Sequence, residues 1–321
     1  MSMLSAAKIF SNLVTHQRAY LLVLVLLVLG LPFLQNSFRH QPVLLSDESY
    51  YHLAQAQTVS GKNFSYAGLH LLDTFIYNRG FFVITLGMAM ASLALFWAIA
   101  KKLALPTETT FLFLALLILS PVFIFTFSSF SGSSLFILLA LSSIFLLLQK
   151  TPYRYGALVP IGAASFIDLF SAILLIGILL WFWRAQGRKK DQFILFLAGI
   201  ASLLFLNNWL LLNLPFTLGP FSTSSPLQDL FADVGSRSGL SIFLVLLAAI
   251  GLLTAKKKEK LAAPIMTLAL FAVLFSQNTN MLFYLALLLT FFATKGFLWL
   301  WWRTWTLESV KSISLFLIIL G

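Results

Sequence analysis

Apolar runs long enough to cross a membrane recur along the whole chain, and this repetition limits the folds that it can adopt. A spanning helix needs about 20 mostly apolar residues. Charged residues make up only 10% of the 321 residues, whereas about 25% is usual in globular domains. The runs are 20–34, 81–100, 110–127, 134–149, 156–183, 193–213, 239–254, 261–275 and 281–302, followed by a last stretch at 312–321. This pattern predicts an all-α fold, a polytopic transmembrane helical bundle.

Basic residues fall mostly in alternate gaps between these runs, which predicts the orientation of the chain because positively charged loops stay on the cytoplasmic side. The run 156–183 fits this alternation only as a short helical hairpin with Asp168 at its external tip, since a lone charge at mid-membrane is costly. With this hairpin, residues 1–321 form a single transmembrane domain of ten crossings and the start of an eleventh. We therefore expect a multi-pass plasma-membrane protein with a cytoplasmic N-terminus and external loops at 35–80 and 214–238.

The composition excludes several classes of function. The chain has no cysteine, so it has no disulfide, thiol catalyst or thiolate metal site. Its net charge of +11 would suggest a nucleic-acid partner in a soluble protein. Here the charge follows from the cytoplasmic loops, so we expect the lipid bilayer and not nucleic acid as a partner.

The last stretch, Ser312–Gly321, has about half the length of a spanning helix, and we expect the natural chain to continue beyond it.

The first external loop carries an acidic pair in a chain with few acids. Ser46 or Asp47 can cap a helix that stops at Gly61. Such a helix would lie along the membrane surface. Glu48 would then occupy its first turn, where the helix dipole favours negative charge. Capping alone therefore accounts for both acids, and a catalytic role is the alternative.

The acidic pair begins the run Asp47-Glu48-Ser49-Tyr50-Tyr51-His52-Leu53-Ala54. This run resembles the first-loop motif of the GT-C membrane glycosyltransferases. Its start is similar to the protein mannosyltransferase and aminoarabinose transferase branch, and its continuation is similar to oligosaccharyltransferase catalytic subunits. The resemblance implies a bundle of GT-C type with a juxtamembrane helix in its long first loop. It also implies transfer of a sugar from a polyprenyl-phosphate donor to a protein, lipid or glycan acceptor on the extracytoplasmic side.

Carried over by position, the resemblance implies that Asp47 is the catalytic carboxylate and that Glu48 supports it. A carboxylate can take the proton that an acceptor hydroxyl or amide loses as it attacks the sugar. Alternatively, Asp47 helps to hold a divalent cation, Mg²⁺ or Mn²⁺, that steadies the leaving phosphate. His52 lies one helical turn further on and would contact the phosphate or the sugar. An interfacial histidine with no ligand is the alternative for His52.

The chain departs from the oligosaccharyltransferase pattern in its second external loop. That family has an acidic motif there, whereas residues 128–134 of this chain contain only Ser, Phe and Gly. A transferase of single sugars is therefore favoured over an enzyme that N-glycosylates proteins.

Three further residues are candidates for binding the substrate. Arg237 lies in the fourth external loop after residues 227–234, which have room for one or two helical turns. This segment is either a lid over the site or ordinary solvated chain. Arginine is a good planar partner for phosphate oxygens, so Arg79 at the start of the second crossing is a second candidate, with snorkelling to the interface as the alternative. Asp168 at the hairpin tip is the third.

Two other classes of function stay open beside a lipid-phosphate-sugar-dependent glycosyltransferase. A transporter or flippase for a lipid-linked or anionic substrate predicts charged residues at mid-membrane and broken helices in matching halves. The sequence shows no convincing internal repeat, and its acids gather at one membrane face. A non-catalytic membrane subunit is the remaining class. The glycosyltransferase is the function that the sequence favours.

Overall fold

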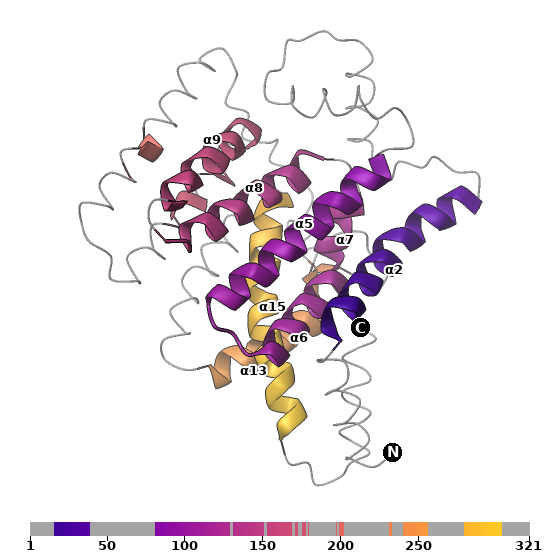
Figure 1. The fold of residues 1–321 in the computed structure, drawn as a ribbon. Coiled ribbons are helices and arrows are strands. Elements are labelled where there is room, and N and C mark those ends of the chain that lie inside the picture. The colour runs from indigo at the N-terminus through magenta and orange to yellow at the C-terminus, as the bar shows by residue number, and fades with distance from the viewer. Residues whose placement is uncertain are drawn as a thin grey trace, which may run out of the picture. The chain divides into compact units, whose positions relative to one another are not determined.

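The computed structural model describes residues 16–38, 81–128, 131–150, 153–168, 240–255 and 279–303, with short pieces at 171–172, 175–177, 179, 197, 199–201 and 231–232. These residues are mostly helical, which confirms the helical character of the predicted fold (Figure 1). The α-helices are α2 (Gln17–Phe38), α5 (Phe81–Lys102), α6 (Thr107–Leu119), α7 (Pro121–Ser128), α8 (Gly132–Leu147), α9 (Leu158–Ile167), α13 (Ile242–Thr254) and α15 (Thr279–Trp302). A 3-10 helix, η2 (Tyr153–Ala157), precedes α9. Each α-helix overlaps an apolar run of the sequence.

Two of the described helices are long and apolar enough to cross a membrane by themselves. They cover Val83–Lys102 in α5 and Leu282–Trp302 in α15. α6 and α7 pass the same test as one bent pair, which makes up to three candidate spans among the described residues. The apolar helices at Gln17–Leu31, Gly132–Leu147 and Ile242–Thr254 are shorter. These helices are compatible with a membrane protein. The ten crossings include segments outside the described residues and stay a prediction.

The run 110–127, which the sequence predicts as one crossing, is broken into two helices. α6 and α7 meet at Ser120 with a bend of 64°. The Ser120 hydroxyl donates to Leu117 O at 2.7 Å and accepts from the Phe123 N–H at 3.3 Å, so it caps the start of α7. Pro121 takes the first helical position, where its missing N–H leaves no hydrogen bond unmade. Serine followed by proline therefore ends one helix and begins the next.

Two short strands precede α13 in the described part of the chain. β1 (Phe231–Ala232) pairs in parallel with β2 (Leu240–Ser241). The expectation of helical turns over 227–234 is therefore wrong for Phe231 and Ala232. Their backbone groups pair with a neighbouring strand, which satisfies them as a helix would. β2 leads directly into α13, and Leu240 is buried at that point.

The chain divides into two compact units whose segments alternate along the sequence. The first unit comprises Met1–Gly30, Leu105–Phe125 and Leu218–Gly321, and the second comprises Leu31–Ala104 and Thr126–Thr217. In the first unit, α15 packs against α13 and α6. In the second unit, α8 packs against α5, η2 and α9, and Figure 1 shows α8 beside α9.

Helices α13 and α15 cross at two facing glycines. A Cβ atom on Gly251 would lie 1.8 Å from Phe292 O, and a Cβ atom on Gly296 would lie 2.1 Å from Leu247 O. No pair of non-bonded heavy atoms comes so close, so only glycine at both positions lets the two backbones approach in this way. The buried residues of α13 are Leu244, Leu247, Ala248 and Gly251. Their spacing defines a single helix face, and this face meets α15.

Candidate functional site

The structure describes one of the six residues that the sequence singles out as a candidate site. That residue is Asp168, in the second unit. The other five lie outside the described residues, and their roles stay predictions: Asp47, Glu48, His52, Arg79 and Arg237.

Asp168 links two helical segments. It is the C-terminal cap of α9 and has an extended backbone, with φ −149° and ψ 101°. Its backbone N–H donates to Ala164 O at 3.1 Å, and its carbonyl accepts from the Ala172 N–H at 3.0 Å. One helical hydrogen-bond series therefore ends at Asp168 and another begins there. The break falls at the residue where the sequence predicts the tip of the hairpin over 156–183, although the course of the second segment includes residues that are not described.

The carboxylate of Asp168 caps the second segment. Its Oδ1 accepts from the Ser171 N–H at 3.1 Å, and its Oδ2 accepts from the Ser171 hydroxyl. Such bonds satisfy a backbone N–H in the first turn of a helix, which has no carbonyl partner inside the helix. Ser171 is fully buried and Asp168 is half-buried. Capping is therefore a structural role for this acid, and a substrate would have to compete with Ser171 for the same two oxygens.

Buried hydroxyl groups are a further polar feature of the described part of the second unit. The Ser134 hydroxyl donates to Ser131 O at 2.8 Å, and the Ser165 hydroxyl donates to Gly162 O at 2.7 Å. Each hydroxyl therefore donates its hydrogen bond to a backbone carbonyl three residues earlier in the chain. Ser92 in α5 is fully buried, and its Oγ has no hydrogen-bond partner in the described part. Small polar residues inside apolar runs are a weak signal for function, so the sequence alone does not mark these serines as a site.

Two basic residues lie over aromatic rings: Lys295 inside α15, and Arg303 directly after its C-terminal end. Lys295 Nζ is 4.8 Å from the centre of the Phe291 ring. The Arg303 guanidinium lies 4.8 Å from the Trp299 ring. Cations over ring faces are attracted by the ring quadrupole. These contacts fit a helix that ends at a membrane interface, where tryptophan and basic residues gather.

Among the described residues, no group of three His, Asp or Glu side chains is placed to hold a metal ion. Asp47, the residue that the resemblance implies as a cation ligand, lies outside them.

Comparison with known proteins found no matching family model, no matching curated protein and no matching solved structure.

Proposed function

We propose that this chain is an integral membrane glycosyltransferase of GT-C type. It would move a sugar from a polyprenyl-phosphate-linked donor to a protein, lipid or glycan acceptor on the extracytoplasmic side. The observation that carries the proposal is the run Asp47–Ala54, which resembles the first-loop motif of these enzymes. The helical class supports it, because α2 ends at Phe38 and α5 begins at Phe81. The motif thus lies between two apolar helices, as the resemblance requires.

The chemistry assigned to the first loop needs a base and a partner for phosphate. The acceptor oxygen or nitrogen forms a bond to the anomeric carbon while the bond from that carbon to the phosphate oxygen breaks. Asp47 takes the acceptor proton, or holds the divalent cation that balances the charge of the leaving polyprenyl phosphate. Glu48 and His52 support this group, and Arg79 and Arg237 are the candidates for binding the phosphate.

The test is sugar transfer by the purified full-length protein from a radiolabelled polyprenyl-phosphate sugar. Asp47→Asn should fold normally, because asparagine caps a helix as well as aspartate does. It should lose about a hundredfold or more in turnover, because asparagine cannot accept the proton. Glu48→Gln should lose less, since its side chain points about 100° away around the helix.

A matched control is Glu108→Gln, which neutralises an exposed acid in the first turn of α6. This variant should keep wild-type turnover. Turnover of Asp47→Asn within about threefold of wild type, far from the loss expected for a general base, would assign Asp47 to capping. It would also remove the main support for a glycosyltransferase.

A transporter or flippase is the second candidate, because the described helices break at Ser120 and at Asp168. Broken helices line the substrate sites of many transporters. The two breaks differ in chemistry, however, since one is a serine–proline pair and the other is a capping aspartate. They are therefore not the matching pair of broken helices, one in each half of the chain, that a transporter predicts. Movement of a lipid-linked sugar from one leaflet of a proteoliposome membrane to the other, without transfer to an acceptor, would favour the transporter.

A further inference from the structure

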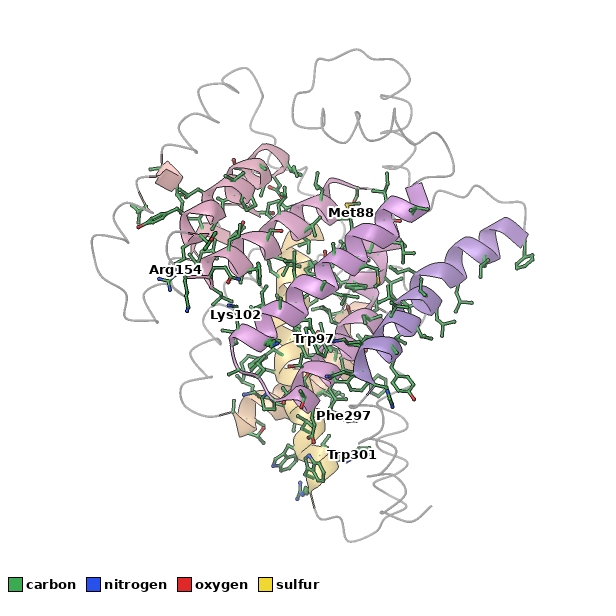
Figure 2. The ribbon with its side chains drawn as sticks, viewed as in Figure 1. Met88, Trp97, Lys102, Arg154, Phe297 and Trp301 are labelled. Carbon is green, nitrogen blue, oxygen red and sulfur yellow. The ribbon has the colours of Figure 1, made fainter. Side chains whose placement is uncertain are left out.

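Four basic residues gather at one end of the second unit. Lys101 and Lys102 end α5, Lys150 follows α8, and Arg154 belongs to η2. α8 packs against both α5 and η2. Figure 2 shows Lys102 and Arg154 toward the same end of these helices, with Met88 toward the other end of α5. We call these four basic residues the basic end.

The charge of the basic end is not neutralised within the described part of the chain. Its three lysines are exposed, Arg154 is half-buried, and none of the four forms an ion pair with a described residue. Asp168 is the one acid among the described residues of this unit, and it lies at the far end of α9 from η2. Among the described residues, the basic end is therefore a concentration of positive charge.

Arg154 is oriented by the backbone. Its Nε donates to Gln149 O, just beyond the end of α8. A cation is favoured there, because the last carbonyls of a helix carry partial negative charge. The other N–H groups of a guanidinium form a planar fork that matches phosphate oxygens, which a lysine ammonium cannot do. Arg154 can therefore fix the position of a phosphate while the three lysines add charge around it.

Apolar side chains surround the basic end, which favours a lipid over a soluble anion. Tyr153 is 70% exposed, Val159 is 74% exposed and Leu103 is 42% exposed. α5 has 22 residues, or about 33 Å of helix at 1.5 Å per residue. This length matches a hydrocarbon core of about 30 Å, so lysines at the end of α5 reach the headgroup level. A tyrosine ring has the same preference for the interface.

We propose that the basic end binds the phosphate headgroup of an anionic phospholipid in the adjacent leaflet. Basic groups beside membrane helices attract anionic headgroups, and each base near the surface strengthens binding about fivefold. The headgroup would lie between Arg154 and the lysines, and the acyl chains would run along the exposed apolar residues. The proposal does not depend on sugar transfer, because the predicted active site lies on the other side of the membrane.

The test measures which lipids stay bound to the full-length protein. The protein is equilibrated with equal amounts of phosphatidylglycerol and phosphatidylcholine, and native mass spectrometry counts the lipids retained. We expect wild type to retain phosphatidylglycerol preferentially. A variant carrying Lys101→Gln, Lys102→Gln, Lys150→Gln and Arg154→Gln should lose that preference by about tenfold or more.

Two further variants separate a local site from general charge. The first removes the same number of charges elsewhere, by changing Lys256, Lys257, Lys258 and Lys260 to glutamine, and should lose much less of the preference than the basic-end variant. The second exchanges Lys and Arg at the four positions of the basic end and should keep most of it. Should the glutamine variant not fold, Arg154→Gln and Lys150→Gln alone should each lower the preference about fivefold.

Three results would overturn the proposal. The first is a wild-type protein that retains both lipids equally. The second is an equal loss of preference in the Lys256–Lys260 variant, which would show that only net charge matters. The third is displacement of the lipid by excess inorganic phosphate, which would make the basic end a site for a soluble anion.

Discussion

Replacing Gly251 by alanine tests the crossing of α13 and α15 most directly. The new Cβ atom would lie 1.8 Å from Phe292 O, 2.7 Å from Phe292 C and 2.9 Å from Gly296 N. Carbon–oxygen contacts between helices are about 3.3 Å at their closest, so the two backbones must separate by about 1.5 Å. All three neighbours are backbone atoms. No side chain can rotate away to make room.

The energy of this change has two opposing parts. Overpacking a closely packed site costs about 1–3 kcal/mol, and the crossing belongs at the upper end because the separation also pulls the neighbouring buried side chains apart. Alanine is favoured over glycine inside a helix by about 1 kcal/mol, which offsets part of the cost. The free energy of unfolding should therefore fall by about 2 kcal/mol. For a chain of 321 residues, that corresponds to a Tm lower by about 3 °C.

The assay is thermal unfolding of the purified protein, followed by the fraction that still elutes at the native position on size-exclusion chromatography. Gly87→Ala in α5 and Gly30→Ala in α2 are matched controls, because a Cβ atom at either position meets no described residue within 4 Å. Both controls should have an unchanged or higher Tm. Gly296→Ala should behave like Gly251→Ala, and the double variant should lose less than the sum, since one separation relieves both clashes. Equal Tm values for Gly251→Ala and Gly87→Ala would refute the close crossing.

Three local features give further predictions, each measured by the same thermal assay. Asp168→Ala should lower the free energy of unfolding by about 1 kcal/mol, whereas Asp168→Asn should keep most of it, because asparagine also caps helices; equal Tm values for the two variants would contradict the capping role. Ser120→Ala should cost about 1 kcal/mol by removing the cap of α7. Ser142→Ala, which removes a hydroxyl that donates to Leu138 O in its own helix, should cost less, and the reverse order would argue against the cap. Ala104 has φ 52°, a left-handed conformation that costs alanine about 1–2 kcal/mol, so Ala104→Gly should raise the Tm, and a lower Tm would show that this strain is absent.

Much of the helical layout could be predicted from local sequence. The run 81–100 becomes α5, Phe81–Lys102, because a backbone in hydrocarbon must satisfy its hydrogen bonds internally and a helix does so within one segment. The break at Asp168 was also predictable, because a lone charge in the middle of an apolar run is costly in a membrane and favours a helix end there. The break at Ser120 carries a local signal too, serine followed by proline, but the apolar run continues through it. The resemblance of residues 47–54 to a first-loop motif is likewise a property of sequence alone.

The tertiary structure decided which helices meet and at what distance. Nothing near Gly251 in the sequence indicates that it faces Gly296, because a helical glycine need not lie at a crossing: a Cβ atom on Gly87 or Gly30 would meet no described residue within 4 Å. The basic end is similar: Lys101 and Lys102 lie far in sequence from Lys150 and Arg154, and the packing of α8 on α5 and η2 brings the two pairs together. A helix begins and ends where nearby residues satisfy or interrupt its backbone hydrogen bonds, so local sequence predicts it. A crossing depends on how two surfaces distant in sequence fit each other, and only the folded chain brings those surfaces into contact.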